Sequence, residues 1–122
     1  LECISGSHLS NILHKPKRFN GNDLYENDNS IEVPDINANR NDYKILSWEI
    51  KAGDAIAFDF RTLHGASENV NKLNRRRIFS ARVVGDDAFF VDRGGKGSPP
   101  FDNIKLKTGE KLIGEEFPII YQ

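Results

Sequence analysis

The 122-residue chain has no methionine, one cysteine (Cys3) and one tryptophan, and its formal net charge is only −1. A single cysteine excludes an internal disulfide framework and suits a reducing, cytoplasmic compartment. A charge near zero produces no overall field that favours nucleic acid or an anionic membrane, so we expect neither as a partner. No apolar run is long enough to span a bilayer. These absences leave a cytoplasmic protein that acts on small molecules or other proteins.

The chain begins with Leu1, Glu2, Cys3 and Ile4, a stretch typical of the end of a strand. Together with the missing methionine, this start predicts a C-terminal portion of a larger protein. We expect such a portion to expose strand edges, which leaves association into a homo-oligomer open.

Short apolar runs separated by turn residues predict a mainly β fold, an antiparallel sandwich or barrel. Hydrophobic residues make up 38% and charged residues 29% of the chain, as is usual for a globular protein. One helical turn is expected near Leu9, and turns are expected at Gly53-Asp54 and Gly85-Asp86-Asp87. The expected strands cover residues 1–5, 43–50, 55–60, 77–84 and 88–91, with a further edge strand at 116–121.

A histidine follows one of these expected strands, and two arginines stand at the head of the next. His64 comes at the exit of the 55–60 run, and Arg75 and Arg76 follow it by eleven and twelve residues. A neutral imidazole can ligate a metal ion, and a guanidinium can grip a carboxylate with two hydrogen bonds. Each residue also has a plain structural reading, a strand-end histidine bonded to backbone and a solvated basic cluster.

A series of motifs runs along the chain, and they are Gly6-Ser7-His8, Trp48 with Gly53-Asp54, Thr62-Leu63-His64-Gly65-Ala66, Asn69, Arg75-Arg76, Gly85-Asp86-Asp87 and Ser98-Pro99-Pro100. This series resembles the phytanoyl-CoA dioxygenase family of non-haem Fe(II)- and 2-oxoglutarate-dependent oxygenases. The resemblance implies the distal half of a double-stranded β-helix, a cupin-like jelly roll. It also implies Fe2+ and 2-oxoglutarate as cofactors, molecular oxygen as co-reactant, and hydroxylation of a small organic substrate.

The resemblance divides the single jelly-roll domain, residues 1–122, into four stretches. The first contains a strand and the Gly-Ser-His loop, the second is a long polar loop rich in asparagine and aspartate, the third holds the core strands and site residues, and the fourth is a C-terminal loop and tail. Their boundaries are 1–18, 19–42, 43–92 and 93–122.

The resemblance also assigns roles to site residues. His64 corresponds to the third ligand of a facial triad of two histidines and one carboxylate. Arg76 is favoured to bind the far carboxylate of 2-oxoglutarate, because Ser80 follows it by four residues as in the family, but Arg75 fits almost as well. Thr62 either hydrogen-bonds a carboxylate near the iron or simply caps its strand.

The His-x-Asp or His-x-Glu pair that completes such a triad is missing from the sequence. His8 is followed by Leu9 and Ser10, and His14 by Lys15 and Pro16. The chain therefore supplies one ligand of three, and we expect it to be inactive alone. Two other hypotheses stay open, a non-catalytic cupin-like module that binds small molecules and a domain whose arginine cluster at 75–77 contacts an acidic partner.

Overall fold

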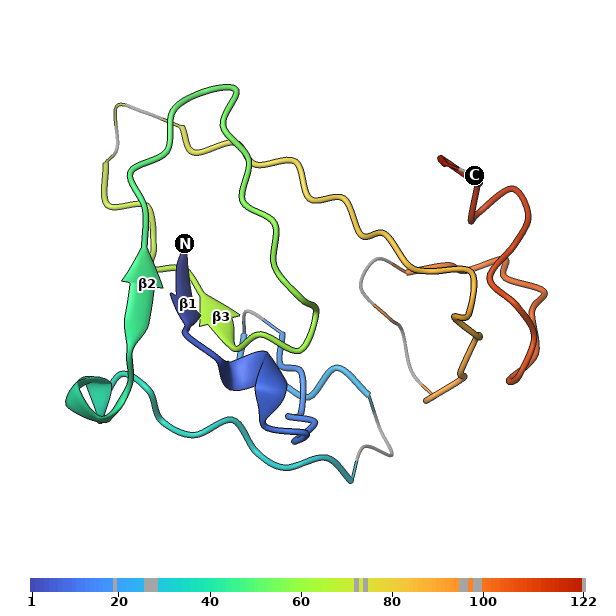
Figure 1. Ribbon diagram of the computed structural model, residues 1–122, viewed down its shortest axis with the longest axis horizontal. Helices are drawn as coiled ribbons and strands as arrows, with labels where there is room; N and C mark the ends of the chain where they lie inside the picture. The colour runs from blue at the N-terminus through green and yellow to red at the C-terminus, as the bar shows by residue number, and fades with distance from the viewer. Residues whose placement is uncertain are drawn as a thin grey trace. The chain divides into compact units, whose positions relative to one another are not determined.

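The N-terminal strand forms the middle of a three-stranded antiparallel sheet (Figure 1). The structure is a computed structural model that describes residues 1–18, 20–25, 29–71, 73, 75–94, 97 and 100–121. Strand β1 (Glu2–Ile4) pairs with β2 (Ile45–Ser47) on one side and with β3 (His64–Gly65) on the other. In this register Cys3 lies opposite both Leu46 and His64. Because directly opposed residues share a face, the sheet places His64 beside Cys3.

The chain divides into two units, which are described separately. The first unit comprises residues 1–15 and 30–77, and it contains the whole sheet. The second unit comprises residues 16–29 and 78–122. Both units are mainly extended chain and turns, with two short 3-10 helices, η1 (Ser7–Leu9) and η2 (Arg40–Asp42), in the first. The described residues contain no α-helix, so the mainly β prediction is confirmed.

Two predicted turns are present where glycine takes a left-handed conformation. Gly6 precedes η1 with φ 76°, and its carbonyl accepts the Leu9 N–H at 2.9 Å. Gly53 has φ 100° in a turn closed by the Asp54 N–H and the Lys51 carbonyl at 3.0 Å. The Asp54 carboxylate accepts the Lys51 N–H at 2.8 Å in return. These turns form because the residues that encode them are adjacent in the sequence.

Two predicted strands were wrong. Residues 55–60 and 77–84 are extended but form no ladder with any described residue. Their apolar patterns are typical of strands, but a strand also needs a neighbour that accepts and donates its backbone hydrogen bonds. In the described part of the chain, β1 pairs only with β2 and β3, and nothing offers such a neighbour to these runs.

The second unit contains a pairing of residues 88–92 with residues 108–112. The Phe90 N–H donates to the Glu110 carbonyl at 2.8 Å, and the Gly109 N–H donates to the Phe90 carbonyl at 2.9 Å. The predicted short strand at 88–91 is thus reduced to a bridge at Phe89, and the predicted edge strand at 116–121 to one at Phe117. The turn predicted at Gly85-Asp86-Asp87 is present, closed by a hydrogen bond of 3.1 Å from the Ala88 N–H to the Gly85 carbonyl. Ser98 and Pro99, predicted to be part of a motif, lie outside the described residues.

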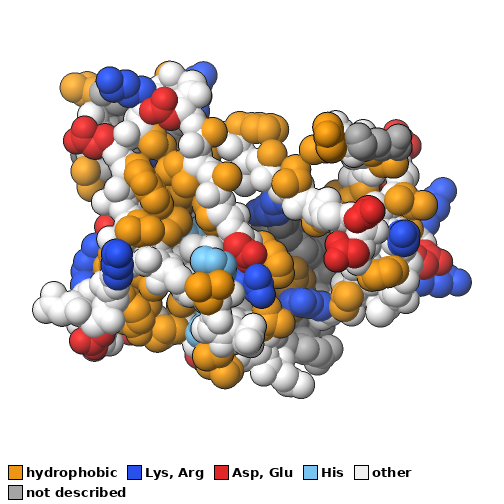
Figure 2. Space-filling view, viewed as in Figure 1, with side chains coloured by type: hydrophobic (Ala, Val, Ile, Leu, Met, Phe, Trp, Pro, Cys, Tyr) orange, Lys and Arg blue, Asp and Glu red, His pale blue; other side chains and the backbone are white. Residues whose placement is uncertain are grey.

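Few side chains are buried. Among the described residues only Cys3 and Thr62 are buried, and large apolar side chains in both units are exposed. Figure 2 shows hydrophobic side chains uncovered on the face that it presents. The sheet is open at both edges, β2 and β3. The jelly roll therefore stays a prediction. No helix in the described residues has the length and apolarity needed to cross a membrane.

Candidate functional site

A tight turn at residues 59–62 precedes His64, the predicted metal ligand. The Asp59 carbonyl accepts the Thr62 N–H at 2.9 Å. The Asp59 carboxylate binds Arg61 three times, through its backbone N–H at 2.8 Å, Nε at 3.0 Å and Nη2 at 3.1 Å. Aspartate at the first position of a turn commonly caps a following N–H in this way. The double contact with the guanidinium ties Asp59 to Arg61 within the turn that precedes β3.

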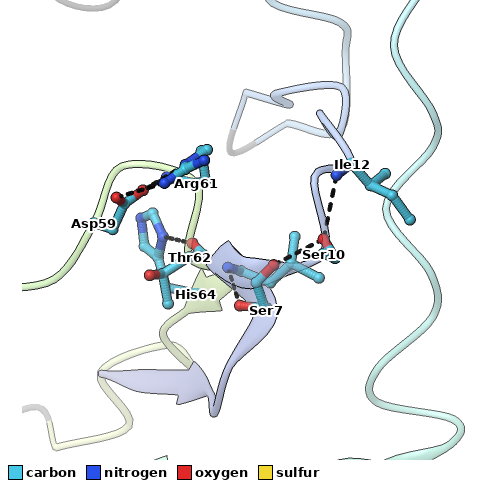
Figure 3. A network of polar contacts seen from close by, with 8 residues as sticks. Ser7, Ser10, Ile12, Asp59, Arg61, Thr62 and His64 are labelled. Atoms are coloured by element: carbon cyan, nitrogen blue, oxygen red, sulfur yellow. Dashed lines mark hydrogen bonds and ion pairs between the residues drawn. The ribbon is translucent and has the colours of Figure 1, made fainter.

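His64 is oriented by its own backbone neighbourhood. Its Nδ1 lies 2.7 Å from the carbonyl oxygen of Thr62 (Figure 3). Since a carbonyl can only accept, Nδ1 must carry the proton in the neutral ring, and Nε2 keeps its lone pair. The Phe58 ring packs against the imidazole with centroids 4.7 Å apart. His64 is exposed as a residue, and Nε2 is the ring nitrogen left with a lone pair for a ligand or metal.

The backbone around His64 is fixed by the first strand and the loop after it. Cys3 pairs with His64, and the Ile4 N–H donates to the Leu63 carbonyl at 2.9 Å. On the other side of the Leu63 residue, its N–H donates to the Ser7 hydroxyl at 2.9 Å. The Gly-Ser-His loop of the sequence is thereby brought to the site.

Thr62 is 8% exposed. Its backbone N–H donates to the Asp59 carbonyl, and its carbonyl accepts from His64 Nδ1. Its hydroxyl has no hydrogen-bond partner among the described residues. A buried hydroxyl usually finds a partner, in the protein or in a bound molecule. The hydroxyl is therefore a candidate contact for a ligand next to His64.

The predicted arginines lie in the same unit as His64. The Arg76 Nη2 donates to the Ser67 carbonyl at 2.9 Å, which ties it to a residue three positions after His64. Three residues span at most about 11 Å, so the Ser67 carbonyl that binds Arg76 lies within that distance of His64 along the chain. Arg75 is exposed and makes no hydrogen bond or ion pair within the described residues. Ser80 belongs to the second unit, and the co-substrate contact that the family resemblance implies for it stays a prediction.

No three of the described histidine, cysteine, aspartate and glutamate side chains gather into a group that could hold a metal ion. His8 is near enough to Asp59 to contribute to lowering the pKa of that carboxyl, but Arg61 already occupies the carboxylate. His14 lies elsewhere, with Nδ1 3.2 Å from the Glu32 carbonyl. The site thus offers one poised imidazole, His64.

The carboxyl group of Asp59 gives a pH-dependent test of the turn. Its hydrogen bonds from Arg61 lower its pKa from the ordinary 3.8 to about 2. A lowered pKa means that the pairing stabilises the fold above pH 3.8 and that this contribution is lost as the pH falls through about 2. We expect the carboxyl carbon of Asp59 to titrate near pH 2 by NMR, and Arg61→Gln to raise that midpoint towards 3.8.

A matched control for this titration is Arg40→Gln. Arg40 forms an equivalent forked pair with Glu2, at 3.0 and 2.9 Å, so its loss removes a guanidinium without touching Asp59. Equal Asp59 midpoints in the wild type and Arg61→Gln would show that the turn is not held by this pair.

Sequence reasoning missed the Asp59–Arg61 pair and the contact of Ser7. Asp59 was counted within an apolar strand, although an aspartate there is itself a turn signal. The contact of Ser7 joins residues 56 positions apart in the sequence, and no local pattern reports it.

A family model described as Phytanoyl-CoA dioxygenase (PhyH) matches residues 1–78. The match includes Ser7, Thr62, His64, Arg75 and Arg76 and ends before Ser80. The comparisons with curated proteins and with solved structures returned no match.

Proposed function

The chain belongs to the phytanoyl-CoA dioxygenase family, and from this membership we propose that it contributes to an Fe(II)- and 2-oxoglutarate-dependent dioxygenase that hydroxylates a small organic substrate. Members of the family are generally dependent on Fe(II) and 2-oxoglutarate. The distal half of a jelly roll is the fold that we propose for the chain in its active state.

The observation that carries the proposal is the bond from His64 Nδ1 to the Thr62 carbonyl, 2.7 Å long. Histidines that ligate metals characteristically donate the other ring N–H to a carbonyl or carboxylate, which fixes the ring and frees the ligating nitrogen. His64 meets this requirement and fits the role of one iron ligand. The described residues bring no two further side chains to His64 to complete a three-ligand set, and we propose that a His-x-Asp or His-x-Glu pair absent from this sequence supplies the other two ligands.

Iron, when bound, would supply the activation of O2 by which one oxygen atom is inserted into a substrate C–H bond and the other into succinate, with loss of carbon dioxide from 2-oxoglutarate. In this proposal the residues of this chain bind and orient the metal and the co-substrate. We assign His64 to the metal, Arg76 or Arg75 to the far carboxylate of 2-oxoglutarate, and the buried Thr62 hydroxyl to a co-substrate oxygen. Ser80 is a further candidate contact for the co-substrate.

The test is formation of succinate from 2-oxoglutarate with Fe(II) and oxygen. The chain alone is expected to give none above a no-protein blank, because its sequence has no His-x-Asp or His-x-Glu pair. The chain fused to a segment that carries such a pair is expected to produce succinate in proportion to enzyme. Calorimetric titration with 2-oxoglutarate is run in parallel. If the fused protein binds 2-oxoglutarate but never turns it over, the cupin-like binding module is the better description.

A further inference from the structure

The hydroxyl of Ser7 joins the first strand to the segment that carries His64. Its O–H donates to the Ile4 carbonyl at 2.9 Å, and its oxygen accepts the Leu63 N–H at 2.9 Å. Both bonds are partly buried, and the second spans 56 residues of sequence. Figure 3 shows Ser7 next to the Thr62 and His64 segment. One hydroxyl thus uses both its donor and an acceptor position, on a backbone group of β1 and on one of the segment just before β3.

The N–H that Ser7 binds belongs to the same peptide unit as the carbonyl that His64 binds. The bond between Thr62 and Leu63 contributes the Thr62 carbonyl on one side and the Leu63 N–H on the other. A peptide unit is planar, so fixing the direction of its N–H also fixes the direction of its carbonyl. Hydrogen bonds at the two ends of one peptide unit also polarise each other and become stronger together.

The orientation of this peptide unit determines which ring nitrogen of His64 carries the proton. The Thr62 carbonyl, aimed by Ser7, accepts the proton of His64 Nδ1 and so selects the tautomer in which Nε2 is unprotonated. We propose that Ser7 is a positioning residue that holds His64, through the 62–63 peptide unit, in the tautomer able to bind a metal through Nε2. The selection of the tautomer is independent of any metal. Its importance for iron rests on the function proposed above.

Ser7 touches neither metal nor co-substrate in this proposal, so its role differs from that of a merely structural serine in one measurable property. A structural serine would alter stability alone. A positioning serine alters the distribution of the proton between Nδ1 and Nε2 of His64. Long-range proton–nitrogen correlation spectra of the chain with 15N-labelled histidine report this distribution directly, and a pH of about 8.5 keeps an ordinary imidazole neutral.

In the wild-type chain we expect His64 to carry its proton on Nδ1. Ser7→Ala removes the acceptor of the Leu63 N–H, and the tautomer ratio is expected to shift about two- to tenfold towards Nε2–H, the range that one hydrogen bond commonly covers. Ser7→Thr keeps a hydroxyl and is expected to restore the wild-type ratio. The control is Ser10→Ala, which also removes a serine hydroxyl bonded to backbone at 2.9 Å but none that contacts Leu63.

An unchanged His64 tautomer in Ser7→Ala overturns the proposal, whatever happens to stability. If Ser7→Ala does not fold, Ser7→Cys keeps the size of the side chain with a much weaker acceptor, and its tautomer ratio decides in the same way. The outcome is separable from the proposed function. A tautomer that depends on Ser7 in a protein whose iron binding ignores His64 supports the positioning role and removes the metal assignment.

Discussion

Replacing His64 by alanine is expected to lower iron-dependent succinate formation by more than about a hundredfold in the preparation completed with a His-x-Asp segment. Loss of a hydrogen-bond partner behind a metal ligand already costs about ten- to a hundredfold in metal affinity or activity, and loss of the ligand should exceed that. Two remaining ligands leave another position to water, and ferrous iron then dissociates more readily. Fe(II) titration followed by the succinate assay measures both effects.

His14→Ala is the matched control for this substitution. His14 is also a surface-accessible imidazole whose Nδ1 lies at hydrogen-bond distance from a backbone carbonyl, that of Glu32. It is followed by Lys15 and Pro16 and has no place in the proposed site. We expect His14→Ala to keep full iron-dependent turnover. Equal turnover in the wild type and His64→Ala would show that the metal assignment is wrong.

The parts of the fold that sequence reasoning predicted are encoded over a few residues. The turns at Gly53-Asp54 and Gly85-Asp86-Asp87 are present because glycine and aspartate favour these conformations by themselves. The helical turn expected near Leu9 is present only as the 3-10 helix η1, which ends at Leu9. The strands at 55–60 and 77–84 failed because pairing is a property of two segments, and their patterns describe only one. The apolar residues in such runs specify a burial that the described chain does not provide.

The candidate site also combines features that a local sequence pattern predicts with features that depend on distant residues. His64 could be found from the sequence because a histidine after a strand and before glycine is a local pattern. The Thr62 carbonyl that binds its Nδ1 is also local, but the contacts that hold this segment in place could not be predicted, since they come from pairing with Cys3 and from the Ser7 hydroxyl across more than 50 residues. The tautomer of His64 thus depends on tertiary contacts, although the Nδ1 atom and the Thr62 oxygen that it binds are only two residues apart in the sequence.

The second large effect is expected for Arg76. The Arg76→Leu variant should raise the apparent Michaelis constant for 2-oxoglutarate about tenfold to a hundredfold while Fe(II) binding changes little. Hydrogen bonds to charged groups contribute roughly 1.5–3 kcal/mol, which corresponds to that range of affinity. Steady-state succinate kinetics at saturating Fe(II), with a separate Fe(II) titration, divide the two effects. Arg76→Lys should recover only part of the loss, because an ammonium cannot form the forked contact.

Arg75→Leu decides between the two neighbouring arginines. Arg76 already has one of its five N–H donors on the Ser67 carbonyl, which holds the guanidinium near the His64 segment and leaves four donors for a carboxylate. Arg75 has no such anchor among the described residues, so ordering it on a ligand costs more side-chain entropy. We therefore expect Arg75→Leu to change the Michaelis constant less than threefold, an effect below about 1 kcal/mol. A larger defect in Arg75→Leu would move the co-substrate contact to Arg75, and no defect in either variant would favour a binding module that does not use 2-oxoglutarate.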